Sequence, residues 1–389
     1  MREYPRIPRE EYEKRWQKVR SIMKEKDVQA LLVYADDHFT YGNAYARYYA
    51  DFPVAFEPVL ILFRENGDPV LLCGPESDGF AGLTGTIKDI RVLQEFANES
   101  EDYPFSDPRP LKEIMEKECE ENIRRLGLAG MELMTAGIYK AISEAFPEAE
   151  LVEMDMILGE SRGVKTESEL EVIRYAYKIA EAGMKAAIDA VATGVTEREI
   201  AAKAEYAMRM MGSEGTGIDT IIASGENTRP ILAKTRMREI QENDIVIVTL
   251  APRYEGYHAA IGRTILVGNP DEKIVEAVKA EARAQEACAS ELKAGVVGSE
   301  VEKIGRKVME EAGYGKNFLY SGLHSVGVVE FEPPIFGPSS ESVLQDNMVI
   351  SIDIPLFEAD GFGARTEDGF IICGDKAERL TNLERVIRK

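Results

Sequence analysis

The first part of the chain alternates between helical and strand patterns of hydrophobic residues. In residues 9–25 apolar side chains recur at intervals of three and four, which predicts an amphipathic helix. The run 30–34 (ALLVY) predicts a buried strand. Two further apolar runs, 59–63 and 69–73, flank the polar segment RENGD, which predicts a β-hairpin. Because this alternation continues to about residue 153, we expect a small α/β domain with a mixed sheet.

A polar, glycine-containing stretch at 157–166 marks a domain boundary, so we expect one domain at 1–157 and a second at 163–389. Two capping boxes each open a helix in the second domain: Thr166 with Glu169, and Thr196 with Glu199. The order of two helices, strands, two helices and strands indicates two α/β halves. The later expected elements are strands at 220–223 and 244–250, helices at 271–293 and 298–312, and strands at 347–354 and 367–373.

Composition and charge narrow the function classes. Of the 389 residues 44% are hydrophobic and 30% are charged, as in a globular protein with a large core. The net charge of −22 repels phosphate backbones and anionic membranes, so we expect neither a nucleic acid nor a membrane partner. The four cysteines form no CxxC pair and the first residues carry no apolar leader, which favours a cytoplasmic protein with free thiols.

Six segments of the second domain resemble, in order and spacing, motifs of the creatinase/prolidase superfamily, whose peptidase members cleave Xaa-Pro bonds. The resemblance implies an α/β (α+β) protein with a pita-bread C-terminal domain, preceded by a smaller creatinase/prolidase-type α/β N-terminal domain. It also implies a homodimer. The matching segments are 222–227 (IASGEN), 244–264 (DIVIVTLAPRYEGYHAAIGRT), 324–327 (HSVG), 332–334 (EPP), 347–353 (NMVISID) and 365–368 (RTED).

Metal-dependent members hold two ions with two aspartates, a histidine and two glutamates. The resemblance places Thr249 and Ala260 at the aspartate positions, His324 at the histidine, and Asp353 and Glu367 at the glutamates. Two neighbouring dications repel each other and need several carboxylates to stay bound. We therefore expect no metal cofactor, although the three remaining ligands could hold one divalent ion weakly.

Creatinase offers a precedent, because it resembles this chain in keeping the fold while replacing the metal ligands. It hydrolyses a C–N bond of a small guanidino compound without metal. However, Leu232 stands where creatinase has its catalytic histidine, and Gly262 where it has a substrate-binding glutamate. A second histidine of the relatives aligns with Phe331. We therefore do not expect creatine as the substrate.

In a metal-free site the expected catalytic residues are His324, Asp353 and Glu367. His324 titrates closest to neutrality and would act as the general acid or base. The resemblance places the two acids on adjacent strands that face this histidine. Paired carboxylates there would bind a cationic group.

Four more residues are expected to bind or brace the substrate. His258 lies two residues before Ala260, so in a strand it would point to the same face and enter the space of the lost aspartate. Thr249 would complete the pocket, while Glu332 and Arg365 are motif positions that brace it.

These residues favour a metal-independent hydrolase that cleaves a C–N bond in a small cationic or zwitterionic metabolite, as a creatinase-like amidinohydrolase or amidohydrolase would. One alternative is a metal-dependent Xaa-Pro dipeptidase or aminopeptidase with an altered ligand set that recruits His258. Another is a non-catalytic descendant that binds a ligand in the same pocket. The sequence leaves the substrate open, as well as the choice between hydrolase, lyase and binding protein.

Overall fold

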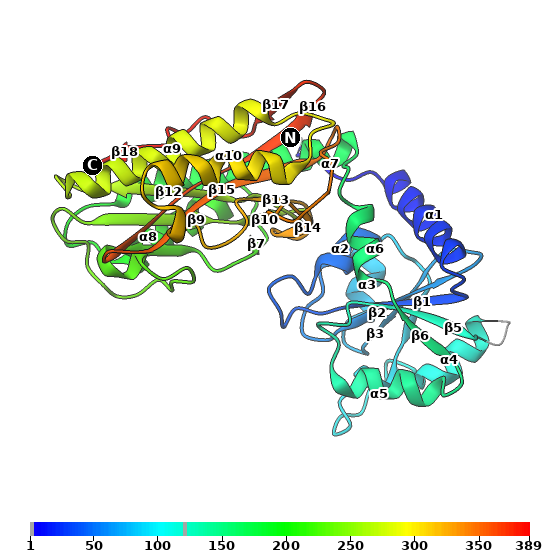
Figure 1. Cartoon of the computed structure of the whole chain (residues 1–389). Helices are drawn as coiled ribbons and strands as arrows, with labels where there is room; N and C mark the ends of the chain where they lie inside the picture. The colour runs from blue at the N-terminus through cyan, green and yellow to red at the C-terminus, as the bar shows by residue number, and fades with distance from the viewer. Residues whose placement is uncertain (1–3, 120–122) are drawn as a thin grey trace. The chain divides into compact units, whose positions relative to one another are not determined.

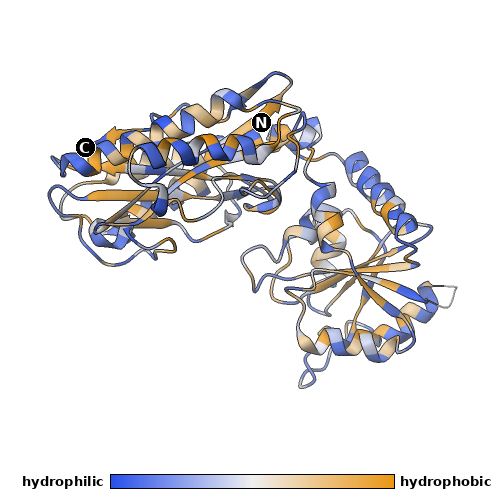
Figure 2. Ribbon diagram, viewed as in Figure 1, coloured by the Kyte–Doolittle hydropathy of each residue, from blue (hydrophilic) through white to orange (hydrophobic). Residues whose placement is uncertain are grey.

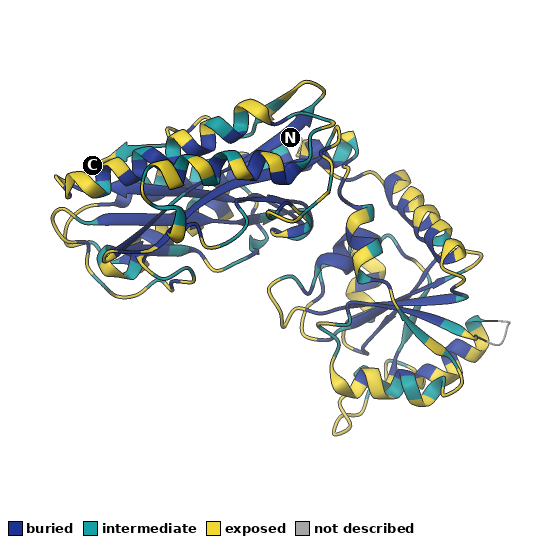
Figure 3. Ribbon diagram, in the orientation of Figure 1, coloured by how far each residue is buried: buried dark blue, intermediate teal, exposed yellow. Residues whose placement is uncertain are grey.

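The computed structural model describes residues 4–119 and 123–389, and the chain divides into two compact units (Figure 1). One unit is Ile7–Ser161, and the other is Arg162–Lys389 with the described residues that precede Ile7. Within each unit the strands carry the most hydrophobic and most buried residues, while the helices expose one polar face (Figures 2 and 3). None of the described helices is long and apolar enough to cross a membrane.

The unit Ile7–Ser161 contains a mixed six-stranded sheet in the order β4-β3-β2-β1-β5-β6. The expected hairpin is confirmed, because β2 (Val59–Arg64) runs antiparallel to β3 (Val70–Cys73). The buried strand β1 (Ala30–Ala35) runs antiparallel to β2 and parallel to β5 (Arg125–Ala129). The remaining elements are α1 (Arg9–Glu25), α2 (Ala44–Ala50), α3 (Asp78–Thr84), β4 (Ile90–Val92), η1 (Gln94–Phe96), α4 (Leu111–Glu118), α5 (Ala136–Ala145), β6 (Glu150–Glu153) and α6 (Asp155–Ser161).

Helix α1 forms where the apolar periodicity predicts it. Its buried stripe includes Trp16, whose indole N–H donates a 2.8 Å hydrogen bond to the carbonyl of Tyr49. The neighbouring Arg15 donates to the carbonyl of Tyr48 at 2.7 Å. These bonds satisfy polar atoms that burial would otherwise leave without a partner, so they fix α1 against the segment that follows β1.

The unit Arg162–Lys389 is built on a nine-stranded sheet with the path β14-β13-β15-β16-β12-β9-β8, and a three-stranded sheet lies apart from it. Both predicted capping boxes are present, at the starts of α7 (Glu167–Ala190) and α8 (Glu197–Met210). The helices α9 (Glu272–Glu291) and α10 (Gly298–Glu311) also form where they are expected. The strands and short helices are β7 (Gly215–Thr216), β8 (Ile221–Ser224), η2 (Gly225–Thr228), β9 (Ile245–Leu250), β10 (Pro252–Tyr254), β11 (Tyr257–His258), β12 (Ile261–Leu266), η3 (Gly315–Asn317), β13 (Leu323–Ser325), β14 (Glu332–Ile335), β15 (Val349–Ala359), β16 (Phe362–Cys373), β17 (Lys376–Arg379) and β18 (Ile387–Arg388).

The last two long strands extend further than the sequence predicts. Instead of ending at 354 and starting again at 367, β15 and β16 form one continuous hairpin that turns at Gly361, whose φ of 86° favours glycine. Pro355 lies inside this hairpin because β13, the other neighbour of β15, pairs only as far as Ile352. The proline nitrogen is therefore not needed for a second ladder.

Alternation along β15 decides which side of the sheet carries polar chemistry. Ile350, Ile352 and Ile354 pack into the core with α9 and α10, which lie over this face (Figure 1). Because successive side chains of a strand point to opposite faces, Ser351 and Asp353 point away from these helices. The polar face of β15 is thus the face on which the predicted site residues can meet.

Candidate functional site

A row of directly paired residues crosses four strands on this face. Asp353 of β15 pairs with Glu367 of β16, which pairs with Gly262 of β12, which in turn pairs with Thr249 of β9. His324 of β13 pairs with Ser351, two residues before Asp353. Strand partners share a face of the sheet, so the register brings these residues together from positions far apart in the sequence.

The imidazole of His324 has a fixed orientation. Its Nδ1 lies 3.1 Å from the carbonyl oxygen of Ser325, which can only accept a hydrogen bond, so Nδ1 carries the proton. Its Nε2 lies 3.7 Å from Oε1 of Glu367, and both side chains are buried. The hydroxyl of Ser351 donates to the same Oε1 at 2.8 Å. Nε2 therefore faces the buried carboxylate of Glu367, to which it donates when the ring is protonated and beside which it can bind a cation when the ring is neutral.

Burial and charge shift the pKa values of this pair in opposite directions. Burial opposes protonation of His324, but the hydrogen bond that the protonated ring donates to Glu367, together with the charges of Glu330 and Glu367, raises the histidine pKa above its usual value. Burial likewise favours the neutral acid at Glu367, yet the hydrogen bond that its carboxylate accepts from His324 and the charge of Arg365 lower its pKa. The carboxylate of Glu367 is thus held ionised.

Asp353 is held on one side by a cation and a phenol. Nη2 of Arg365 lies 3.1 Å from Oδ2 of Asp353, and the hydroxyl of Tyr320 donates to the same oxygen at 2.7 Å. No described donor reaches Oδ1, although this atom is buried. Burial raises the pKa of Asp353 to about 7, while Arg365 opposes the rise. The second oxygen of this carboxyl group is therefore available to a ligand from outside the chain.

His324, Asp353 and Glu367 together form a group that can share one metal ion. One ligand atom from each lies within 4.8 Å of the other two, and all three residues are buried. Imidazole nitrogen and carboxylate oxygens bind Zn²⁺, Mn²⁺ and Co²⁺, and the unpartnered Oδ1 of Asp353 gives this group an open coordination atom. The residues present fit a single divalent cation. A second one finds no carboxylate at Thr249 or Ala260.

Two of the predicted substrate-binding residues, His258 and Glu332, lie outside the group of His324, Asp353 and Glu367. His258 belongs to β11, which ends before Ala260. Strand alternation therefore does not place the side chains of His258 and Ala260 on the same face. Its ring nitrogen Nδ1 lies 3.3 Å from the carbonyl oxygen of Gly327, and among the described residues it is not part of the ligand group. Glu332 forms an ion pair at 2.9 Å with Lys165, and both are buried. Glu332 therefore braces the unit, as its motif position suggested.

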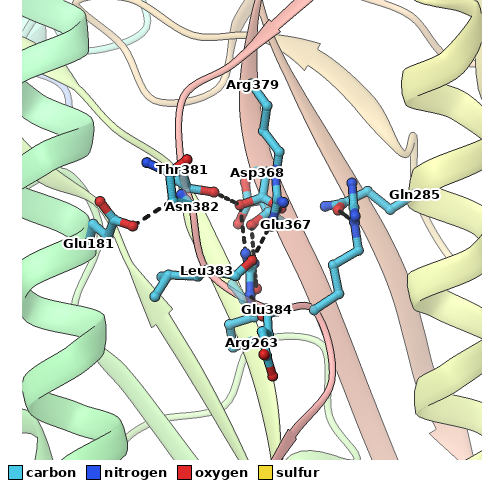
Figure 4. Close-up of polar contacts among 12 residues, drawn as sticks. Glu181, Arg263, Gln285, Glu367, Asp368, Arg379, Thr381, Asn382, Leu383 and Glu384 are labelled. Atoms are coloured by element: carbon cyan, nitrogen blue, oxygen red, sulfur yellow. Dashed lines mark hydrogen bonds and ion pairs between the residues drawn. The ribbon is translucent and has the colours of Figure 1, made fainter.

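A second buried carboxyl group lies directly beside the site in sequence. Asp368 accepts hydrogen bonds from Arg263 at 2.7 Å, from Arg379 at 2.7 Å and from the hydroxyl of Thr381 (Figure 4). Arg263 also donates to the backbone carbonyl of Glu367 at 2.7 Å. This cluster fixes the backbone of β16 at the position that carries Glu367.

Two residues of the site were missed in the sequence. Ser351, which orients Glu367, is two residues before Asp353 in the same strand, so the period-two pattern could have found it. Tyr320, which contacts Asp353 and Arg365, lies between η3 and β13. No regular spacing links a residue in such a segment to the strand it contacts.

Both parts of the chain match known protein families. Residues 171–373 match metallopeptidase family M24, and residues 15–164 match the creatinase/prolidase N-terminal domain. The chain belongs to metallopeptidase family M24. Similar proteins include the Xaa-Pro dipeptidase of Pyrococcus horikoshii, 31% identical over 85% of this chain and 94% of that protein. The Xaa-Pro dipeptidase of Pyrococcus furiosus is 34% identical over 78% of this chain and 86% of that protein.

Solved structures give the same fold. The prolidase from Pyrococcus horikoshii superimposes with a TM-score of 0.83 at 27% identity, covering 96% of this chain and 99% of that one. The X-Pro aminopeptidase from Thermotoga maritima gives a TM-score of 0.82 at 26% identity, with coverage of 96% and 99%. The predicted superfamily, the two-domain pita-bread fold and the assignment as a hydrolase of this superfamily are confirmed.

The prediction that the protein has no metal cofactor is wrong. The chain is a member of a metallopeptidase family, and His324, Asp353 and Glu367 form a group that can hold an ion. The prediction gave most weight to the two lost aspartates. However, three protein ligands are the usual number in a catalytic metal site, because the remaining positions are left for water and substrate. The comparisons favour the metal-dependent alternative over the metal-independent hydrolase.

Proposed function

We propose that this protein is a metal-dependent Xaa-Pro dipeptidase that uses an altered ligand set. The observation that carries the proposal is the buried group of His324, Asp353 and Glu367, with ligand atoms within 4.8 Å of one another. Its support from outside the chain is the resemblance to proteins named Xaa-Pro dipeptidase, at 31% and 34% identity. The substrate class would be dipeptides that end in proline.

A bound divalent cation supplies the chemistry in such a site, because it lowers the pKa of a water molecule and polarises a carbonyl group. The chain's own residues orient the ligands: Ser325 holds His324, Ser351 holds Glu367, and Arg365 with Tyr320 holds Asp353. A ligand that is already oriented loses less entropy when the ion binds.

The surroundings of His324 suit an apolar substrate ring. The ring centroid of Phe331 lies 4.4 Å from that of His324, and Phe331 is 38% exposed. The superfamily resemblance places Phe331 and Leu232 at positions where relatives have a histidine. The pyrrolidine ring of proline can pack on an exposed aromatic side chain. Because neither position offers an imidazole for proton transfer, we expect slow turnover compared with relatives that keep both.

Hydrolysis of paired dipeptides tests the proposal. Protein loaded with Mn²⁺ or Co²⁺ should release proline from Leu-Pro and should act at least tenfold more slowly on Leu-Ala. Glu367→Gln, which removes a charged ligand, should lower kcat/KM by two orders of magnitude or more, in the range ~10²–10⁴ that single catalytic groups supply. The exposed Asp360→Asn serves as the control and should be unchanged. Folded, metal-loaded protein that releases no proline would sink the proposal and favour a ligand-binding descendant.

We also propose that the protein works as a homodimer in the cytoplasm. The support is the match of residues 15–164 to the creatinase/prolidase N-terminal domain, together with the net charge of −22 and the free cysteines. Light scattering at micromolar concentration should give twice the chain mass of 43.3 kDa. A mass of one chain across this range would contradict the dimer.

A further inference from the structure

The possible metal ligands lie at one end of the row formed by Asp353, Glu367, Gly262 and Thr249. Its Asp353 end carries the three ligands, and its Thr249 end carries none. Thr249 and Ala260 are 2% and 1% exposed, so an exposed acid cannot easily reach the places of their side chains. His258 is not part of the ligand group. Among the described residues, the group that could hold a metal ion includes no residue from the Thr249 end of the row.

Gly262 lies in this row between Glu367 and Thr249, and the space above it is used by an arginine. A Cβ atom built on Gly262 would lie 2.8 Å from both Cγ and Cδ of Arg365. Real Cβ atoms do not approach other heavy atoms so closely. The absent side chain thus gives the aliphatic stem of Arg365 a path across β12.

The guanidinium group of Arg365 reaches the end of the row that lacks ligands. Its Nη1 lies 3.3 Å from Oγ1 of Thr249, and its Nη2 lies 3.1 Å from Oδ2 of Asp353. The side chain of Arg365 is 12% exposed. A fixed positive charge therefore lies between the site carboxylates and Thr249.

We infer that each chain holds one divalent metal ion, bound by His324, Asp353 and Glu367, and that Arg365 supplies the positive charge at the Thr249 end. The inference deepens the proposed function, since it rests on the same three ligands. It departs from the two-ion site that the superfamily resemblance implies.

Ligand chemistry and charge both support a single ion. One imidazole and two carboxylates can bind one Zn²⁺, Mn²⁺ or Co²⁺ ion and leave positions for water. A second dication would face the guanidinium group of Arg365 without a carboxylate at Thr249 or Ala260 to offset the repulsion. Arg365 thus acts as a positioning residue: it holds Oδ2 of Asp353 and leaves Oδ1 for the ion.

Metal counting tests the inference without any activity measurement. The full chain is saturated with Mn²⁺ or Co²⁺, freed of loose ions by gel filtration, and measured by elemental mass spectrometry and calorimetry. The wild type should hold one equivalent per chain, and Glu367→Gln should hold less than a tenth of one. Thr249→Asp with Ala260→Asp should raise the count to two, because the new carboxylates supply the absent ligands and offset the charge of Arg365.

The matched control is Thr249→Asn with Ala260→Asn, which adds similar volume without charge and should stay at one equivalent. Wild-type protein that holds two equivalents, or none, would overturn the inference. So would an aspartate double variant that stays folded by circular dichroism and binds one. Failure of the proposed function looks different: one equivalent bound with no cleavage of Leu-Pro refutes the peptidase and leaves the single-ion site standing.

Discussion

Glu367 and Asp368 are neighbours on β16, both are buried, and their surroundings are opposite in kind. Asp368 points into the layer between the sheet and the helices α7 and α9, where two arginines and a threonine contact its two oxygens (Figure 4). Glu367 points to the other face, where Ser351 and His324 contact it, and its partner Asp353 keeps one buried oxygen without a described donor. Adjacent positions of β16 therefore carry Asp368, whose oxygens have donors from the chain, and Glu367, which belongs to a group with an unpartnered carboxyl oxygen.

The difference indicates how a sheet can hold buried acids for structure and for binding. Arg263 and Asp368 are each 0% exposed, so every cation that neutralises Asp368 is part of the chain. At the site Arg365 pairs with Asp353 and His324 faces Glu367, while Oδ1 of Asp353 has no described donor. A cation from solution can replace the proton that this group otherwise holds.

Removal of the buried carboxylate of Asp368 should strongly lower the free energy of unfolding. Asp368→Ala leaves Arg263 and Arg379 without their shared carboxylate, and removing one partner of a buried ion pair costs about 3–5 kcal/mol. Urea unfolding measures the change in the free energy of unfolding. The exposed pair of Asp360 and Lys273 provides the control, because Asp360→Ala should leave the free energy of unfolding almost unchanged. Equal costs for the two variants would remove the distinction between braced and surface carboxylates.

Glu281 differs from both Glu367 and Asp368, because it is a buried carboxyl group without a described hydrogen-bond donor. Glu281 of α9 is buried, and no described donor contacts either of its oxygens. Burial, and next the charge of Asp353, raises its pKa well above 4.5, while Arg365 opposes the rise. At neutral pH the folded chain therefore holds a proton at Glu281 that the unfolded chain has lost.

The sign of the pH dependence follows from this proton. The contribution of Glu281 to stability is fully present below the unfolded pKa of 4.5 and is lost as the pH rises toward the folded pKa. Glu281→Gln should remove this slope, so the variant should be more stable than the wild type at pH 7. Denaturant unfolding between pH 5 and pH 8 measures the difference. The exposed Glu276→Gln on the same helix should leave the slope as it is, and a parallel wild-type and Glu281→Gln profile would contradict the prediction.

Ser351 supports Glu367, so its substitution should lower metal affinity by a modest factor. Ser351→Ala removes the 2.8 Å hydrogen bond that orients Glu367, without touching the three ligands themselves. Loss of such a supporting contact typically lowers metal affinity about 10–100-fold. Calorimetric titration with Mn²⁺ measures it. Ser325→Ala is the control, because the buried hydroxyl of Ser325 has no described partner and only its backbone carbonyl contacts His324. An unchanged affinity in Ser351→Ala would mean that Glu367 needs no support.

Local patterns determined much of the fold. The period of the apolar residues located α1, the β2–β3 hairpin and the later helices, and the capping boxes at Thr166 and Thr196 set the starts of α7 and α8. These features depend on interactions between residues that are close in the chain, so a short window of sequence contains their physical cause.

The same approach failed where a strand or a contact depends on distant partners. Residues 355–366 belong to the β15–β16 hairpin, although a proline usually indicates that a segment is not a central strand. Pro355 is tolerated because β13 pairs with β15 only as far as Ile352, which the local sequence does not reveal. His258 was placed by strand alternation, but the short β11 ends before Ala260. Alternation holds only while the backbone stays extended.

The residue types alone establish that positions 324, 353 and 367 carry side chains that can bind an ion and that positions 249 and 260 carry no carboxylate. How these side chains lie relative to one another follows from the tertiary structure. The register of β15, β16, β12 and β9 lines up Asp353, Glu367, Gly262 and Thr249, and the gap at Gly262 lets Arg365 cross to Thr249. Such an arrangement depends on distances between strands that are remote in sequence, and free energies of charge interaction depend on those distances and on burial. Residue identity fixes the chemistry that is available, and the packing of the sheet fixes where each charge lies.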